Sequence, residues 1–446
     1  MSAFRHSISR RQLIQSTALG AGAATMGISS ILASGTAPAK VTRTSSSQET
    51  QKVRALVWSN GPTIDGHFEN RFKAFNEAHS GSIEVDLQFL PWDQYWQKLQ
   101  LGYSSGDVYD VYFWDVQAYG HYKRDLLLNL QPMIEATDLL DSAKYPTALF
   151  EPWKLDGTNM FAVPENLQTI ALYYNKALFD ADGLAVPDDT WNYDQIVEAA
   201  TALTKRDGDR VNQWGMNVGN LGVWWGTQTL SWARGDAFFD KVLEPTKFQF
   251  SNPANVEALD FVRALVNDHK VAPTPAVSAE SGDTTGFQSG RIGLVVEGSW
   301  QISAFAELPF EWGVTSIPMV GTTRVPAYFM GGWVIAKDSK VPEAAFEWAR
   351  WSASDYQEVM ATEHDWLPIQ NDVRASAATT DGLPEGYRAV IDSLETARIG
   401  DVYSSNTQQI WVEVFEPKMT EMMNDNKPAS EIAPQIDEAA NALLEG

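Results

Sequence analysis

The hydrophobic and polar positions that follow residue 52 repeat with two different periods. Val53–Trp58 is apolar except for Arg54, which is typical of a buried strand, and Ile83–Phe89 alternates apolar with polar residues, as a half-buried strand does. Between them, the phenylalanines of 68–75 recur at the spacing of one helix face. A second helix, at about 92–103, and a strand at 108–114 continue the series. The pattern predicts βαβ units with a mostly parallel sheet.

Polar and aromatic side chains stand at the carboxyl ends of two of these predicted strands. Asn60 follows the first strand, and Trp114 and Asp115 lie at the end of the third. In open α/β sheets, ligands bind beyond the carboxyl ends of the strands. We therefore expect these residues to lie near a ligand.

The stretch from residue 155 to residue 179 predicts two strands, Met160–Val163 and Thr169–Tyr174, interrupted at Pro164. Two arrangements fit this pattern. The strands form an ordinary sheet edge, or they carry the chain from one α/β lobe into another.

The second half of the chain again alternates helices with short strands. Predicted helices end near 203, cover 253–266, 342–352, 409–423 and 430–444, and predicted strands cover 292–296 and 334–336. Pro434 conflicts with the first turn of the last helix. Gly219–Asp236 predicts a glycine-rich loop, and we expect Trp224 or Trp225 within it to serve a ligand.

Length and charge narrow the class of protein. The chain has 446 residues, and at ~150 residues per domain it predicts two or three domains. Its formal net charge of −24 argues against nucleic acid or an anionic membrane as a partner. Cysteine is absent, which excludes disulfides, thiolate metal sites and a lipid-modified N-terminal cysteine. The 17 tryptophans offer flat faces of the kind that sugar binding uses.

The N-terminus has the features of a twin-arginine export signal. Residues 1–39 contain no acidic residue, include Arg10 and Arg11 ahead of a mildly apolar run, and end in the small residues of 37–39. A membrane anchor is the alternative, but the run is diluted by Gly, Ser and Thr and falls short of ~20 strongly apolar residues. Residues 40–52 predict a disordered spacer. We expect a free periplasmic protein, with the signal removed near Ala39.

The sequence carries no recognisable catalytic or metal-binding motif. The six histidines show no metal-binding spacing, and no nucleophile elbow or phosphate-binding loop occurs, so we expect no cofactor and no metal. Tyr173 and Tyr174 could bind iron as a pair, but neighbours on a strand point to opposite faces, which favours two core tyrosines. The many carboxylates leave a glycosidase pair open.

Several segments together resemble family 1 extracellular solute-binding proteins, the sugar-capturing subunits of ABC importers. They are PWDQYWQKL at 91–99, VYFWD at 111–115, a valine–proline followed by LYYNKALF at 172–179, and GSW at 298–300. The resemblance runs from about Val53 to the C-terminus. It implies a two-lobe α/β fold, the type II periplasmic-binding-protein fold, with a ligand cleft at a hinge.

The resemblance also implies domain boundaries and site residues. The first lobe is expected at 53–165 plus 333–375, and the second at 166–325 plus 380–446, with crossovers near 164–168 and 324–332. The expected ligand-binding residues are aromatic walls, hydrogen-bonding side chains and a glycine pair: Trp92, Trp114, Trp225, Trp300, Trp333, Trp411, Asn60, Asp115, Asn166, Gln168, Arg398, Gly331 and Gly332. Gln168 stands where maltodextrin-binding members have a carboxylate. Arg398, if it faces the cleft, favours an acidic or sulfonated sugar; the alternative is a surface ion pair.

The implied function is capture of a sugar or sugar derivative by hinge closure, without chemistry, followed by delivery to an ABC permease. We expect a monomer. Two alternatives stay open. One is a secreted carbohydrate-active enzyme that uses two cleft carboxylates. The other is a binding protein for a polyol, a glycerophosphodiester or a metal chelate.

Overall fold

The computed structural model describes residues 49–139, 141–145, 150–281, 283–364, 366–377 and 383–445. The predicted export signal and residues 40–48 of the predicted spacer lie outside this part of the chain. Strand β1, Gln51–Trp58, begins two residues before its predicted start, so Gln51 and Lys52 belong to the strand and not to the spacer. Among the described residues, none of the helices has both the length and the apolar character that crossing a membrane requires.

The strands form one connected path across the molecule, in the order β2-β1-β3-β9-β4-β7-β6-β5. Beside this path β10 and β8 pair with β4, and β11 pairs with β9. After β1 the strands are β2 Ile83–Leu90, β3 Val111–Phe113, β4 Val163–Asn175, β5 Lys205–Asp207, β6 Arg210–Asn217, β7 Ile292–Gly298, β8 Trp312–Ser316, β9 Ala327–Ile335, β10 Leu367–Pro368 and β11 Arg398–Ile399.

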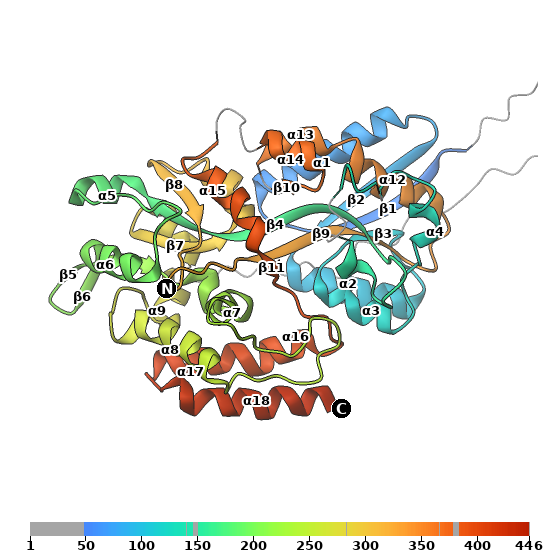
Figure 1. The fold of residues 1–446 in the computed structure, drawn as a ribbon. Coiled ribbons are helices and arrows are strands. Elements are labelled where there is room, and N and C mark those ends of the chain that lie inside the picture. Colours follow the sequence, from blue (N-terminus) through green and yellow to red (C-terminus); the bar gives the residue numbers. More distant parts are fainter. Residues whose placement is uncertain are drawn as a thin grey trace, which may run out of the picture. The chain divides into compact units, whose positions relative to one another are not determined.

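The first half of the sheet confirms the predicted βαβ units. Strand β1 pairs in parallel with β2 on one side and with β3 on the other. The helices of this half, on the right of Figure 1, lie on both faces of these strands. They are α1 Pro62–Ala78, α2 Trp92–Ser105, η1 Val116–Ala118, α3 Tyr119–Lys123, α4 Gln131–Ile134, η3 Glu151–Trp153, α12 Pro342–Ser354, α13 Gln357–Glu363 and α14 Asn371–Ala377.

Two long strands, β4 and β9, join the halves and run side by side across the centre of Figure 1. The predicted break at Pro164 is wrong, because β4 is one continuous strand of 13 residues. The proline is tolerated because it lies at the start of the strand, where a register shift against β9 occurs between Pro164 and Asn166. Residues 160–162, predicted as strand, are not in one. Likewise β9 begins at Ala327, seven residues before its predicted start.

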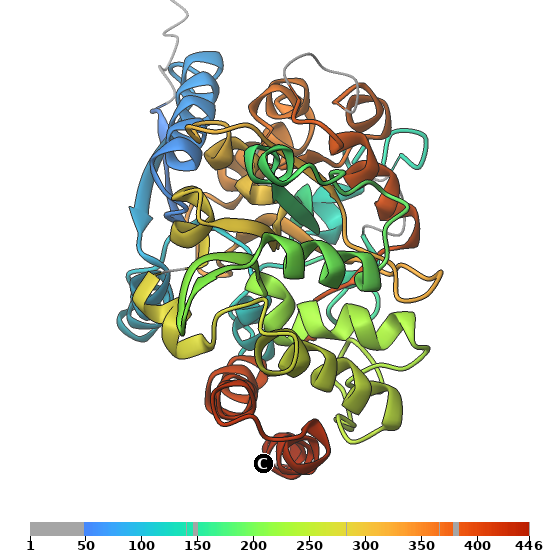
Figure 2. The same ribbon diagram turned by 90° about the vertical axis from the view of Figure 1, so that its left-hand side faces the viewer.

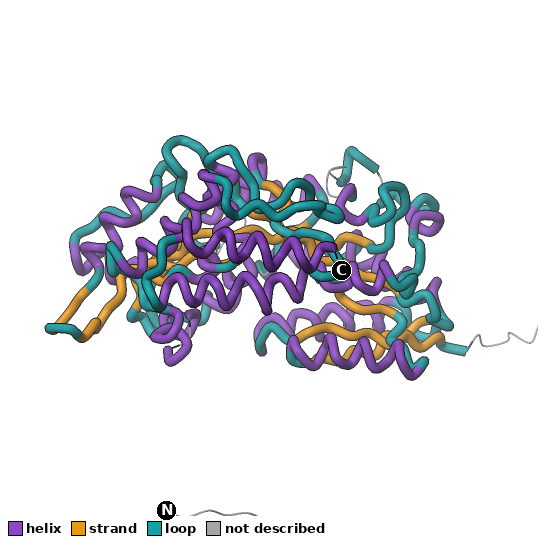
Figure 3. Tube along the Cα trace, turned by 90° about the horizontal axis from the view of Figure 1, so that it is seen from below, coloured by secondary structure: helices purple, strands orange, loops and turns teal. Residues whose placement is uncertain are grey.

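The second half surrounds the far end of β4, which pairs there with β7 and β8. Strand β6 extends this sheet in parallel with β7. The helices of this half are α5 Lys176–Asp182, α6 Tyr193–Leu203, η4 Gly219–Gly222, α7 Trp224–Ala233, α8 Pro253–Asn267, α9 Pro275–Ser281, α10 Asp283–Gln288, η5 Ser299–Gln301, α11 Ile302–Phe305, α15 Tyr387–Asp392, η6 Ser393–Thr396, α16 Thr407–Gln409, η7 Ile410–Phe415, α17 Glu416–Asn424 and α18 Ala429–Glu445. Viewed from below, helices lie on either side of most of the strands (Figure 3).

Helix α7 corrects the prediction of a glycine-rich loop at 219–236. Its start is packed so closely on η4 that a Cβ at Gly226 would lie 1.8 Å from the carbonyl oxygen of Asn220. Gly226 therefore serves a close approach between backbones and does not break the helix. With this packing, Trp224 and Trp225 lie in the first turn of α7.

The C-terminal helices α17 and α18 lie side by side along one edge of the molecule (Figures 1 and 2). The predicted helix at 409–423 is divided, because residues Ile410–Phe415 form a π-helix between α16 and α17. Pro434 does not end α18, which begins at Ala429 and continues past the proline. The fully buried Ile432 and Ile436 hold both sides of the proline against the core.

Strand β4 is buried on both faces. Ala171 and Tyr173 belong to one core cluster, whereas Leu172 and Tyr174 belong to the other. The hydroxyl of Tyr173 donates to the carbonyl oxygen of Gly298 at 2.7 Å. The two tyrosines are thus core residues on opposite faces, as predicted.

Candidate functional site

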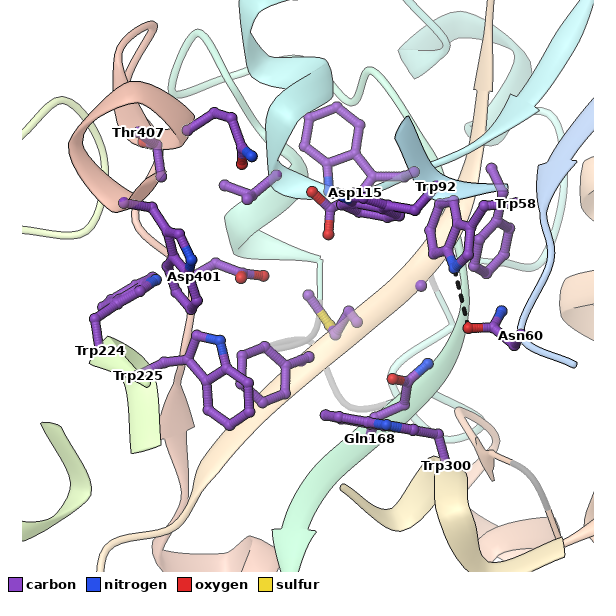
Figure 4. A pocket seen from close by; sticks show the side chains of 18 of the residues that line it. Trp58, Asn60, Trp92, Asp115, Gln168, Trp224, Trp225, Trp300, Asp401 and Thr407 are labelled. Atoms are coloured by element: carbon purple, nitrogen blue, oxygen red, sulfur yellow. Dashed lines mark hydrogen bonds between the residues drawn. The ribbon is translucent and has the colours of Figure 1, made fainter. Parts of the chain in front are cut away.

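A cleft of about 460 Å³ lies where the two halves of the sheet meet, at the carboxyl ends of β1 and β3. This volume is within the usual range for small-molecule sites. Its described lining residues come from both halves and from the two connecting strands: Trp58, Asn60, Trp92, Phe113, Trp114, Asp115, Val116, Gln168, Trp224, Trp225, Trp300, Phe329, Met330, Gly331, Trp366, Asp401, Thr407, Gln408, Trp411, Val412 and Glu416. Figure 4 shows many of these side chains arranged around an open space.

One wall of the cleft is built on β1, at the point where this strand ends. The ring of Trp58 lies edge-on to that of Trp92, with centroids 5.1 Å apart, and Trp92 begins helix α2. The indole Nε1 of Trp58 donates to Oδ1 of Asn60 at 3.2 Å (Figure 4). The bond orients the Asn60 amide beside two aromatic rings.

The facing wall comes from the second half and from β9. Trp225 of α7 lies edge-on to Phe329 of β9, at 4.9 Å between ring centroids, and Trp300 is 6.3 Å from Trp225. Trp411 approaches from the π-helix, 6.5 Å from Trp225. An α-helix, a strand, a 3-10 helix and a π-helix therefore contribute one aromatic ring each.

Carboxylates lie between these walls. Asp115 and Asp401 both point into the open space in Figure 4, Asp115 from the end of β3 and Asp401 from the segment after β11. Burial raises the pKa of the Asp401 carboxyl well above its usual range, and repulsion from Asp115 raises it further. A third carboxylate, Glu416, accepts a hydrogen bond from Nε1 of Trp411.

Nine of the thirteen predicted site residues line the cleft. They are Asn60, Trp92, Trp114, Asp115, Gln168, Trp225, Trp300, Gly331 and Trp411. Trp224 and Trp225, one of which was expected to face a ligand, both line the cleft.

Trp333 and Asn166 were expected in the cleft, but their side chains lie in the core. Both are fully buried, and Nε1 of Trp333 donates to Oε1 of Glu165 at 2.9 Å. Asn166 Nδ2 donates to the same carboxylate, at 3.1 Å from Oε2. These side chains hold the crossing strands together under the cleft.

Gly332 and Arg398 also lie outside the cleft lining. A Cβ at Gly332 would be 2.5 Å from the carbonyl oxygen of Val163, so this glycine allows β9 to approach β4. The guanidinium of Arg398 lies 6.0 Å from the ring of Trp232, away from the cleft. Arg398 therefore gives no support to an acidic or sulfonated sugar as ligand.

Sequence reasoning missed eleven lining residues: Trp58, Phe113, Val116, Phe329, Met330, Trp366, Asp401, Thr407, Gln408, Val412 and Glu416. Trp58 ends a predicted strand beside Asn60, and this position could have identified it. Asp401 and Thr407 follow a two-residue strand that no periodicity reveals. Among the described residues, no group of three His, Cys, Asp or Glu is placed to hold a metal ion.

The sequence matches a protein family and is similar to known binding proteins. Residues 60–358 match the model of the bacterial extracellular solute-binding protein family. A binding protein of Brucella abortus is 23% identical over 386 residues, covering 83% of this chain and 91% of that protein. A maltooligosaccharide ABC transporter solute-binding lipoprotein of Streptococcus pneumoniae is 21% identical over 291 residues, covering 63% of this chain and 64% of that one.

A solved structure shares the fold. It is an ABC substrate-binding protein of Listeria monocytogenes in complex with cycloalternan, and it superposes with a TM-score of 0.79 at 22% identity, over 89% of this chain and 100% of that one. The predicted two-lobe, type II periplasmic-binding-protein fold is thereby confirmed, as is the resemblance to the maltodextrin-binding type.

Proposed function

This chain belongs to the bacterial extracellular solute-binding protein family, and we propose that it captures a carbohydrate in its cleft and delivers it to an ABC permease. The observation that carries the proposal is the composition of the cleft wall. Eight of its described lining residues are tryptophans, contributed by both halves of the sheet. The two relatives and the solved neighbour described above are themselves binding proteins, so we propose capture without catalysis.

The chemistry of the wall suits a sugar ring. The axial hydrogens of a pyranose form an apolar face that packs on an indole, while its hydroxyls require acceptors and donors at the ring edge. Asn60, Asp115 and Gln168 supply such groups between the aromatic rings. An extended apolar ligand would offer no hydrogen-bonding group to these side chains.

We propose that capture proceeds by closure of the halves, as lobes of 53–165 plus 333–375 and 166–325 plus 380–446, about β4 and β9. Polar contacts between the halves support this motion. The hydroxyl of Tyr119 in α3 donates to Oε1 of Glu244 at 2.9 Å, and Lys123 of the same helix pairs with Glu244. Glu244 belongs to the second half, so these bonds exist only when the halves are together.

Delivery of the sugar to a permease requires that the protein be exported. We propose that residues 1–39 direct the protein through the twin-arginine pathway to the periplasm, that cleavage follows near Ala39, and that the mature protein acts as a monomer with a transmembrane permease as its partner. The arginine pair and the small residues before the cleavage position support this route.

The test is a thermal-shift screen of the purified protein against neutral sugars, oligosaccharides, sugar acids and polyols, with chemical analysis of each ligand afterwards. A ligand at a hundred times its Kd adds about 2.7 kcal/mol to the folded state and raises the midpoint. A sugar that is recovered unchanged supports the proposal. A hit confined to polyols overturns the sugar cargo and keeps the binding role.

A second candidate, a carbohydrate-active enzyme, is favoured by one observation. Asp401 has a raised pKa beside Asp115, and glycosidases use a protonated acid next to a second carboxylate. Cleavage of any glycoside in the screen, abolished by Asp401→Asn, would establish the enzyme instead.

A further inference from the structure

The side-chain amide of Gln168, in the cleft lining, is held by a residue outside the lining. Gln168 and Asn166 are two positions apart on β4, so their side chains leave the same face of the strand. Nε2 of Gln168 donates to Oδ1 of Asn166 at 3.1 Å. Asn166 is fully buried beneath the cleft. The orientation of the Gln168 amide therefore depends on that of Asn166.

The amide of Asn166 is fixed by two partners of opposite kind. The backbone N–H of Gly331 donates to Oδ1 at 3.3 Å, and Nδ2 donates to Oε2 of Glu165 at 3.1 Å. An N–H group only donates and the carboxylate of an ion pair only accepts, so exchange of the amide oxygen and nitrogen would break both bonds. A Cβ at Gly331 would lie 2.6 Å from Nδ2 of Asn166, so the glycine leaves room for this amide.

Glu165 is itself held from the other side. Its Oε1 accepts from Nη1 of Arg71 at 2.8 Å, from Nε1 of Trp333 at 2.9 Å and from the hydroxyl of Ser352. All three donors are buried, which leaves Oε2 for Asn166. A chain of hydrogen bonds thus runs from the buried ion pair to the cleft.

This chain leaves one polar atom of Gln168 for a ligand. Because Nε2 is bonded to Asn166, the carbonyl oxygen Oε1 is the atom that remains. Among the described residues, no group donates a hydrogen bond to this oxygen. Figure 4 shows the Gln168 side chain reaching from β4 toward the open space. An unrestrained amide offers a ligand either a donor or an acceptor, whereas this one offers only an acceptor.

We propose that Asn166 makes Gln168 an obligate hydrogen-bond acceptor, so that the cleft selects a sugar whose hydroxyl donates to Gln168. The inference rests on the proposed function and adds a positioning residue and a rule of specificity to it. A sugar with fluorine in place of that hydroxyl keeps nearly the same shape but has no proton to donate. A site built to bind a hydroxyl discriminates strongly against such an analogue, because its own polar group is left unpaired.

The first experiment is calorimetric titration of the purified wild-type protein. The probes are glucose, galactose, mannose, maltose, cellobiose and any further neutral sugar that binds in the thermal-shift screen, each with its monofluorinated derivatives. At one ring position we expect fluorine to weaken binding about tenfold or more. Fluorine that is tolerated at every position would overturn the inference.

Variants of Asn166 test whether this residue sets the specificity. In Asn166→Ala the Gln168 amide is free to turn, and the difference between hydroxyl and fluorine should shrink to about twofold or less. Asn166→Asp is the conservative variant. It keeps an oxygen toward Gln168, and its protonated form donates to Glu165, so the difference should persist.

Asn76→Ala is the matched control for a lost bridging asparagine. Asn76 of α1 donates to the carbonyl oxygen of Val85 at 3.0 Å and accepts from its N–H at 2.8 Å, away from the cleft. This variant should lose folding stability and keep the full difference between hydroxyl and fluorine. A difference that shrinks equally in Asn76→Ala would assign a merely structural role to Asn166.

Nuclear magnetic resonance of the ligand-free protein provides a second readout. The side-chain amide protons of Gln168 are identified by their loss in Gln168→Glu. In the wild type, the proton donated to Asn166 should resonate downfield of free glutamine amides, and in Asn166→Ala it should return to their range. Both wild-type measurements hold even if Asn166→Ala fails to fold.

The outcomes separate the two proposals. If sugars bind and fluorine is tolerated everywhere, or if the Gln168 amide protons resemble those of free glutamine, the inference is wrong and sugar capture stands. If no neutral sugar binds, sugar capture fails and the rule of specificity fails with it.

Discussion

Arg71 of helix α1 and Glu165 of the crossing strand β4 form an ion pair that is sealed from solvent. Nη1 of Arg71 lies 2.8 Å from Oε1 of Glu165, and the two side chains are 1% and 0% exposed. Glu165 also accepts from Trp333 and Ser352, and Arg71 reaches Glu363 at 3.2 Å. The pair therefore fastens the connecting strand to the first half, directly beneath the cleft.

Removing the acid should be severely destabilising. Glu165→Gln leaves the buried Arg71 with one carboxylate fewer, and loss of one partner of a buried pair costs about 3–5 kcal/mol. Urea unfolding measures the loss. Asp392→Asn, in an exposed pair, is the control and should change the unfolding free energy little. Equal effects of the two substitutions would contradict this role.

Replacing cleft tryptophans should separate binding from stability. Trp225→Ala removes a partly exposed ring of the cleft wall, and we expect at least tenfold weaker sugar binding with a small change in Tm. Trp333→Ala should do the reverse, because this ring is fully buried and holds Glu165. Calorimetric binding and thermal unfolding of both variants provide the comparison. A Trp225→Ala variant that unfolds early but binds normally would assign this ring to the core.

The Asp401 carboxyl should make stability depend on pH. Asp115 faces it from the segment after β3, Tyr328 from β9 and Tyr403 from its own segment. Its folded-state pKa lies above the unfolded value of about 3.9. Wild-type stability is therefore lost as the pH rises from about 4 through the folded pKa, because the unfolded chain ionises first.

The Asp401→Asn variant should not lose folding stability in this way, because the amide does not ionise. The Tm of the variant minus that of the wild type should increase between pH 3 and pH 7, as measured by calorimetry without ligand. For Asp392→Asn the corresponding difference should stay flat. A difference for Asp401→Asn that falls with pH would show that the carboxylate is stabilised when ionised.

The contact between Tyr119 and Glu244 should bias closure. Tyr119→Phe removes the 2.9 Å hydrogen bond that joins the halves while it keeps the ring against Tyr403. We expect sugar affinity to fall a few-fold, because a smaller fraction of molecules is closed. Small-angle scattering should give a larger radius of gyration for the ligand-free variant. Tyr145→Phe, within the first half, is the control and should leave the affinity unchanged.

The periodicity of hydrophobic positions along the sequence predicted many of the helices and strands. The residues at the predicted strand ends then indicated part of the cleft lining. Apolar runs and the helical spacing of phenylalanines located β1, α1 and β2, because burial on one or both faces requires those periods. The rule that ligands lie beyond strand ends pointed to Asn60, Trp114 and Asp115, and all three line the cleft.

Only the tertiary structure decided which neighbouring residues face the cleft and which face the core. Gly331 lines the cleft, whereas Gly332, one residue away, lies on the opposite face of β9. Trp333 is on the same face as Gly331 but is fully buried against Phe113 and Trp348. Asp401 enters the cleft from a segment without periodicity, and Trp411 from a π-helix whose geometry local propensity does not specify. The charge of the cleft, which arises from segments nearly 290 residues apart, is likewise a property of the folded chain alone.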